Sequence, residues 1–441
     1  RKEDPYCDGD MCDISFQRQG SILGASLLIA GSALGGGMLA VPSATAAAGC
    51  LPSLVTLLGM WAFLLVQGLL LVEVNIAVAE WLERRSASML SLAQITLGRT
   101  AGAVVAASYL IYSNAVLISQ ISRGGAILSS LVPVLSHTAG VLVVAGSGAS
   151  LLYFNTSSGI DRTNQALTGL LVLAFVGMLA CGMPHAAWDR LLRADWLAAP
   201  GTVPTILQVL TFGNLIPVVC TYLDCDRDRT RKAVIIGSFI PTFMVGLWTV
   251  MASALVPFAP GAAFADPTDA LIGGGGGVVV GALVAMFAGA AVYTTIIGVL
   301  MSLHEFWEEA LRENATVSRS VSSSGSMEGE ELPFQWYRHP GVREIASRIV
   351  ALAPATLIAV AAPGEVFYQV LAFSGAYVAT ILFGFAPPLM VMVTRGQRPA
   401  GREWLGPDSQ RIVPGGNWTL MALGAITMYI VFMSAQVDIP N

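Results

Sequence analysis

Long apolar segments recur along the chain, and their length constrains the fold more than any other feature. A membrane-spanning helix needs about 20 consecutive, mostly apolar residues. Because lipid offers the backbone no hydrogen-bond partners, such segments must fold as helices rather than as open strands. The sequence therefore predicts an all-α polytopic membrane protein with 11 transmembrane helices in a lipid bilayer. The predicted spans are 21–47, 52–79, 101–131, 138–156, 164–183, 203–223, 233–257, 277–303, 346–362, 366–394 and 417–436.

Composition excludes several other classes of protein. Charged residues make up 12% of the chain, whereas soluble domains carry about 25%. This shortage of charge excludes a nucleic-acid-binding protein, a disordered chain and a disulfide-stabilised secreted domain. The sequence also lacks an HExxH zinc motif and a GxxxxGK[ST] phosphate-binding loop. We therefore expect neither an enzyme nor an ATP-driven pump, and no metal site.

The Lys and Arg residues predict the orientation in the membrane. With the N-terminus inside, 20 of the 23 fall on the inner side, Arg190 and Arg193 fall outside, and Arg123 lies within a span. Positive charge concentrates on the cytoplasmic side of membrane proteins. We therefore expect the N-terminus inside and the C-terminus outside.

Two of the predicted spans contain residues that interrupt a helix. The first reads "GGG" at 35–37 with Pro42 five residues later, and the sixth reads "TFGNLIP" over 211–217. Glycine costs about 1 kcal/mol relative to alanine inside a helix, and backbone outside a helix at membrane depth must line a cavity or be buried in protein. Interrupted helices at matching places in two halves indicate the binding site of a secondary transporter. The alternative is close helix packing through small residues.

The two interrupted spans lie five helices apart, so the sequence predicts two five-helix repeats that are inverted relative to each other. A substrate with an ammonium and a carboxylate group would bind the backbone freed at the two breaks. The predicted units are a polar tail (1–20), a first repeat (21–183), an outer loop (184–202), a second repeat (203–394) with a flexible inner loop (308–345), and an inner loop with the eleventh helix (395–441). The predicted substrate-binding residues are Ser32, Ala33, Leu34, Gly35, Gly36, Gly37, Thr211, Phe212, Gly213 and Asn214.

Polar side chains within the spans are candidates for ion coupling, since ionisable groups in a membrane are costly and usually functional. Glu73 in the second span is a candidate proton carrier, or else a structural carboxylate. Asn114 in the third span lines the cavity or bonds to a neighbouring helix. Phe212 is a candidate wall for an aromatic side chain. The eighth span carries a polar stripe that ends at Glu305, which we expect at the inner interface.

Several segments resemble a known family. "AGSALGGGMLAVP" (30–42) is similar to the opening signature of the hydroxy and aromatic amino acid permeases, which include bacterial tyrosine and tryptophan permeases. The resemblance continues at "WAFLLVQGLLLVEVN" (61–75), "FGNLIPVVCTYLDCDRDRTRKAVIIGSFIP" (212–241), "YTTIIGVLMSLHEF" (293–306) and "PGEVFYQVLAFSGAYVA" (363–379). It implies an eleven-helix, LeuT-like member of the amino acid–polyamine–cation superfamily that carries aromatic amino acids such as tyrosine or tryptophan by proton symport. Bacterial members often have a His where this chain has Gly213-Asn214, so any contact made by that His does not carry over.

The resemblance also bears on the coupling ion and the location. In related folds, adjacent hydroxyl residues of the eighth helix coordinate sodium, and Thr294 and Thr295 occupy that place, so sodium is the alternative to a proton. No cofactor is implied. The wording of 61–75 is closest to plant and algal members, which favours the plastid inner envelope over a plasma or bacterial inner membrane. The sequence is also compatible with a sodium-coupled carrier of different neutral amino acids, and with a non-transporting sensor or structural subunit. It does not indicate an oligomeric state.

Overall fold

The computed structural model of the chain describes residues 20–34, 37–38, 41–82, 88–132, 134–154, 157–259, 277–323, 340–361, 374–396 and 411–437. In these ranges the backbone is helical apart from turns, and an isolated bridge pairs Gly49 with Ala194. The α-helices are α1 (Ile22–Ala33), α2 (Val41–Thr45), α3 (Cys50–Trp81), α4 (Met89–Leu131), α5 (His137–Phe154), α6 (Ser157–Gly182), α7 (Val203–Leu210), α8 (Ile216–Tyr222), α9 (Arg227–Leu255), α11 (Gly277–Ser323), α12 (Pro340–Ala361), α14 (Ala386–Gly396) and α15 (Asn417–Val437). Shorter turns include η2 (Met183–His185), η3 (Trp188–Leu192), η4 (Ala199–Thr202), η5 (Gly213–Leu215) and the π-helical η8 (Ser374–Ala379) and η9 (Ile381–Phe385).

The apolar helices lie where the sequence predicts membrane spans. Within the described ranges, seven helices are long and apolar enough to cross a membrane. Four shorter apolar helices, at Ile22–Ala33, His137–Leu151, Ile345–Ala361 and Asn417–Met433, overlap the first, fourth, ninth and eleventh predicted spans. The all-helical membrane class is thus confirmed, and the total of eleven spans stays a prediction.

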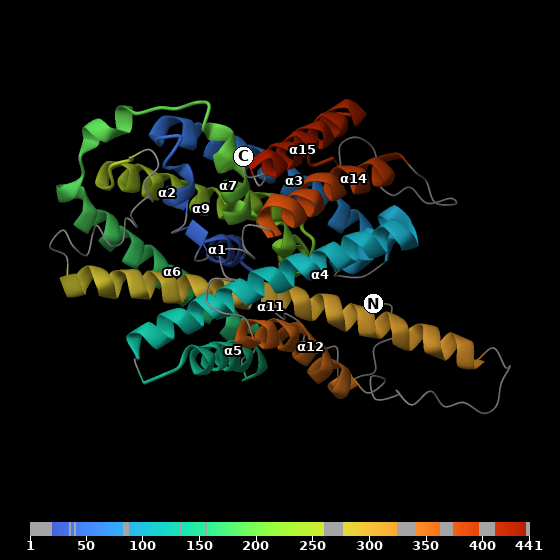
Figure 1. Cartoon of the computed structure of the whole chain (residues 1–441). Helices are drawn as coiled ribbons and strands as arrows, with labels where there is room; N and C mark the ends of the chain where they lie inside the picture. The colour runs from blue at the N-terminus through green and yellow to red at the C-terminus, as the bar shows by residue number, and fades with distance from the viewer. Residues whose placement is uncertain are drawn as a thin grey trace.

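Helix α11 lies at the centre of the bundle. It packs against α1, α4, α5, α6 and α12. In Figure 1 it is the long yellow helix that α4 crosses, with α5 and α12 on one side and α1 on the other. Helix α11 therefore contacts both the start of the chain, at α1, and helices from its middle and later parts.

Two boundaries differ most from the sequence prediction. The third helix begins at Met89 rather than 101, with a kink at Gly98 where φ is 80°. The eighth helix continues to Ser323, into the loop predicted over 308–345. Its first part beyond 303 is rich in Glu, Ala, Leu and Arg, which favour helix. Residues 324–339 of that loop lie outside the described residues.

Segments that the charge count assigns to one side of the membrane gather at one end of the bundle. Gly20 donates its N–H to the Tyr222 carbonyl at 3.2 Å. Arg229 donates to the Gly20 carbonyl, and Arg227 donates to the Arg411 carbonyl. These contacts join the starts of α1 and α9, the end of α8 and the segment before α15, all of which the charge count places inside.

The segments that the same count places outside meet at the opposite end. Arg193 donates to the carbonyls of Ala46 and Ala47 just after α2, and Arg190 donates to the carbonyls of Ala254 and Leu255 at the end of α9. The grouping of the two sets of loops is therefore consistent with the predicted sidedness.

Candidate functional site

The first break lies between α1 and α2. Helix α1 ends at Ala33, and the Leu34 N–H still bonds to the Ala30 carbonyl at 2.9 Å. Gly37 and Met38 are buried in a short turn. Gly35 and Gly36 lie outside the described residues. The last carbonyls of a helix have no partner within it, so the end of α1 presents carbonyl oxygens to its surroundings.

Those carbonyls meet two threonines of α11. The Thr294 hydroxyl donates to the Gly31 carbonyl at 2.8 Å, and the Thr295 hydroxyl donates to the Ser32 carbonyl at 3.1 Å. Both threonines are buried. Two hydroxyl oxygens and two carbonyl oxygens therefore meet directly beside the first break.

The second break separates α7 from α8. Helix α7 ends at Leu210, Thr211 is extended with ψ of 125°, and a short 3-10 turn over Gly213–Leu215 leads into α8. The Thr211 hydroxyl donates to the Leu207 carbonyl at 2.6 Å, which caps the end of α7. Pro217 stands in the first turn of α8, where a missing N–H costs nothing. The break predicted from "TFGNLIP" is thus present.

One face of α11 contacts both breaks. Thr294 and Thr295 bond to the end of α1, and seven residues beyond Thr295 the Ser302 hydroxyl donates to the Asn214 carbonyl of the second break at 3.1 Å. Between them Gly298 leaves room for Ser32, whose Oγ lies 2.9 Å from where a Cβ of residue 298 would be. The polar stripe predicted on this helix therefore holds the two breaks side by side.

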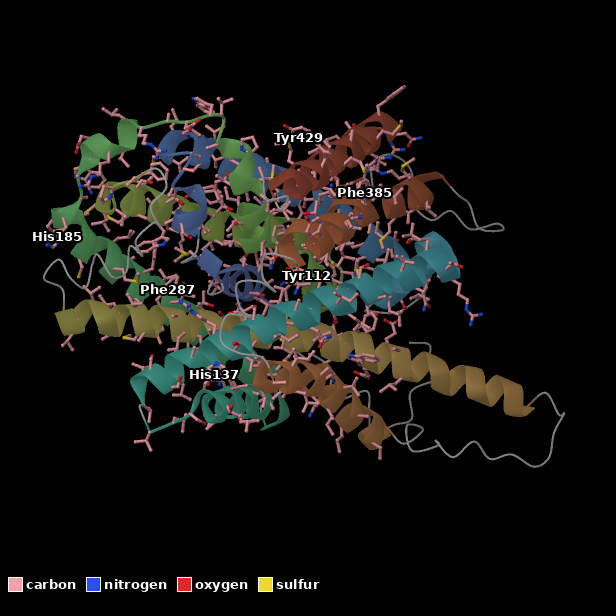
Figure 2. The ribbon with its side chains drawn as sticks, viewed as in Figure 1. Tyr112, His137, His185, Phe287, Phe385 and Tyr429 are labelled. Atoms are coloured by element: carbon pink, nitrogen blue, oxygen red, sulfur yellow. The ribbon has the colours of Figure 1, made fainter. Side chains whose placement is uncertain are left out.

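Aromatic rings surround the second break. Tyr112 of α4 and Phe383 of η9 pack edge to face with ring centroids 5.3 Å apart. A Cβ on Gly213 would lie 2.3 Å from Cδ1 of Phe383, so that ring approaches the backbone where only glycine fits. The Phe212 ring instead lies over Gly68 of α3. In Figure 2 Tyr112 is near the middle of the molecule, whereas His185 and Tyr429 lie at its edges.

The sequence does not single out Phe383. In a membrane helix a phenylalanine looks like lipid-facing or packing surface, and nothing in "ILFGF" marks this one. The signal is structural, because the helix around it winds as π-helix, a rare form that is frequent at functional sites.

The structure does not bring Glu73 to the breaks. Its carboxylate accepts two hydrogen bonds from Arg395, at 2.7 and 2.8 Å, and two more from the backbone N–H groups of Ile412 and Val413. Arg395 also donates to the carbonyls of Val413 and Gly415. The pair is buried at the end of the bundle where α3, α14 and the segment before α15 meet. This geometry favours the structural interpretation of Glu73 over the proton carrier.

Asn114 lies in α4, two residues beyond Tyr112. Its amide nitrogen donates to the Leu110 carbonyl of its own helix at 2.9 Å, and its amide oxygen is buried without a hydrogen bond in the described part of the chain. A buried oxygen without a hydrogen bond is costly. The Asn114 amide oxygen is therefore an acceptor in the interior that a bound donor could satisfy.

Comparison with known proteins identifies the family. The sequence profile of the tryptophan/tyrosine permease family matches residues 18–435. The chain is 26% identical over 430 residues to "Tyrosine-specific transport system 2" of Haemophilus influenzae, covering 93% of this chain and 96% of the relative. It is 28% identical over 313 residues to "Tyrosine-specific transport system 1" of the same organism, covering 69% of this chain and 77% of the relative. A "Tryptophan-specific transport protein" of that organism is 24% identical and covers 55% of this chain and 62% of the relative.

A solved structure shows the fold. The crystal structure of MhsT in complex with L-phenylalanine superposes with a TM-score of 0.67 at 14% identity, covering 96% of this chain and all of that one. The likeness supports the LeuT-like architecture with inverted repeats and broken first and sixth helices. The chain is therefore an integral membrane protein of the permease class and belongs to the tryptophan/tyrosine permease family.

Proposed function

We propose that this protein is a secondary active transporter that carries aromatic amino acids such as tyrosine or tryptophan by alternating access, coupled to protons. The observation that supports it most is the face of α11 that hydrogen-bonds to both breaks. These bonds hold two stretches of freed backbone together in the protein interior, which is where transporters of this architecture bind substrate. The curated relatives that are named for tyrosine and tryptophan transport support the substrate class.

The substrate site in this proposal lies between the breaks. The predicted residues of the first break (Ser32 to Gly37) and of the second (Thr211 to Asn214) offer backbone groups to the ammonium and carboxylate of the amino acid. Tyr112 and Phe383 supply an aromatic wall next to Gly213, because edge-to-face contacts between rings add to the free energy of burial. Movement of one group of helices relative to the other would expose this site to each side of the membrane in turn.

Sodium coupling is the second candidate, and one observation favours it. The hydroxyls of Thr294 and Thr295 meet the carbonyls of Gly31 and Ser32, and freed backbone carbonyls bind sodium in transporters with broken helices. Without an ion the hydroxyls donate to those carbonyls, and with an ion all four oxygens would turn their lone pairs toward it. The same residues would serve a proton-coupled carrier as caps of α1.

We also propose the plastid inner envelope as the location, with the N-terminus inside and the C-terminus outside. The distribution of Lys and Arg supports this orientation. The likeness of 61–75 to plant and algal members supports the organelle over a plasma or bacterial inner membrane. Protease accessibility of tags at the two termini in isolated organelles tests both points.

Uptake into proteoliposomes tests the proposed function. Labelled tyrosine and tryptophan are offered under an imposed pH gradient, and then under a sodium gradient. Accumulation that a pH gradient drives and an uncoupler abolishes is the expected result. Accumulation that needs sodium would move the coupling site to Thr294 and Thr295. Failure of every amino acid to enter under either gradient would favour a sensor or a structural subunit with the transporter fold.

A further inference from the structure

The face of α11 that contacts the breaks continues into a carboxyl group, Glu305, one turn beyond Ser302. Ser302 donates to the carbonyl of Asn214 in the second break. Helical residues three apart share a face, so Glu305 follows directly below that contact. The sequence predicts this residue at the membrane interface, but the structure places it against two other helices.

Helices α4 and α8 both pack on α11, the helix that carries Glu305. Tyr109 of α4 is buried, and its ring stacks on that of Phe306, the residue after Glu305, with centroids 5.5 Å apart. Helix α8 carries Cys220, which is fully buried. Glu305 thus lies where α4, α8 and α11 meet. It is between the second break and the end of the bundle that carries Glu73.

The other acidic groups near Glu305 have partners. Glu309 accepts a hydrogen bond from the Ser88 N–H at 3.0 Å, at the start of α4. Glu308 lies 3.7 Å from the His304 ring nitrogen. No hydrogen bond or ion pair from the described residues reaches the carboxylate of Glu305, and the charged groups that act on it are Glu308 and Glu309, both of the same sign.

Of the other helices that pack on α11, α12 carries a positive charge, Arg348, but no ion pair in the described part of the chain joins it to this carboxylate. Helix α1 has no titratable side chain. Ser347 of α12 bonds to His304 rather than to Glu305. Glu305 is half-buried. An ionised carboxylate that is partly withdrawn from water without a counter-charge is costly, and binding a proton removes that cost. Opening of the pathway to water would lower the cost of the charge and release the proton.

We infer that Glu305 is the group that binds the coupling proton, taking it up as the free carboxylate and releasing it when its end of the pathway opens. The inference rests on the proposed proton-coupled transport and names its acceptor. Proton binding at Glu305 would change the position of the adjacent turn of α11. Because Ser302 in that turn bonds to Asn214 of the second break, the change would affect the substrate site.

The test separates concentrative uptake from exchange. A transporter carrying one proton per substrate accumulates it about tenfold for each pH unit of gradient. We expect Glu305→Gln to reduce this accumulation to equilibration while still exchanging internal for external tyrosine, because exchange needs no net proton movement. Glu308→Gln, on the next turn of the same helix, is the matched control and should accumulate like the wild type. Accumulation by Glu305→Gln at the wild-type level would overturn the inference.

A second measurement does not depend on how the variant folds. A hydrophobic carbodiimide reacts with protonated carboxyls in apolar surroundings, so mass spectrometry of the wild type should find Glu305 modified, less so as the pH is raised. An unmodified Glu305 at every pH that permits transport would overturn the inference. If the wild type itself fails to accumulate substrate under a pH gradient, the proposed coupling fails first, and the two failures are thereby distinguished.

Discussion

Replacing Glu73 by glutamine tests whether the buried carboxylate of α3 is structural. The Glu73 side chain is 1% exposed and that of Arg395 is 6% exposed, and the carboxylate accepts four hydrogen bonds. Glutamine would leave the guanidinium without a counter-charge and would turn an NH₂ donor toward other donors. Breaking a buried pair by removing one partner costs about 3–5 kcal/mol, so the free energy of unfolding should fall by that amount.

The assay is reversible unfolding in mixed detergent micelles, followed by tryptophan fluorescence. Arg395→Gln alone should cost a similar amount, and the double variant should lose less than the sum, with a coupling energy of about 1–3 kcal/mol. Glu80→Gln, exposed near the end of the same helix, is the control and should change stability by no more than about 0.5 kcal/mol. The fraction of the Glu73→Gln variant that folds should still accumulate substrate under a pH gradient. A Glu73→Gln variant with wild-type stability that exchanges substrate but no longer accumulates it would refute this reasoning and restore Glu73 as the proton carrier.

Three further predictions follow from single contacts. Gly213→Ala should abolish transport, because its Cβ would lie 2.3 Å from a ring carbon of Phe383. Adding Phe383→Leu should restore part of the uptake. Wild-type uptake by the single variant would contradict the assigned contact. Thr294→Val should destabilise the protein by about 1–3 kcal/mol, since it leaves the Gly31 carbonyl without its 2.8 Å donor, whereas Thr294→Ser should not; equal unfolding free energies for the two variants would be the opposing result. Burial, followed by nearby carboxylates, raises the pKa of the Cys225 thiol from 9.0 to about 11, so its alkylation should be slow at neutral pH and rise with pH until about 11; a rate that levels off near pH 9 would exclude the shift.

The helices and the two breaks could be predicted from the sequence because their causes are local. Apolar length predicts a membrane helix wherever the segment occurs, and the prolines at 42 and 217 with nearby glycines interrupt it wherever it packs. The polar face of α11 was predictable for the same reason, since Thr295, Gly298 and Ser302 follow helical spacing.

The partners of the polar groups could not be predicted, because they depend on segments far apart in the chain. Glu73 meets a residue 322 positions away, and Ser302 meets one 88 positions away. Composition also misled the prediction of a loop from 308 onward, where local helix formers extend α11. The contact of Phe383 with Gly213 likewise joins distant segments, and no pattern in its own span reveals it.

The two arginines at the end of the bundle opposite Glu73 have a consequence for how the molecule can move. Arg193 holds the turn after α2, and Arg190 holds the end of α9. Both lie in the segment between α6 and α7, and α2 also packs on α9. Hydrogen bonds from a charged donor are worth about 1.5–3 kcal/mol each. Separating α2 from α9 would break these hydrogen bonds, so a movement that opens this end of the bundle must first release Arg190 and Arg193.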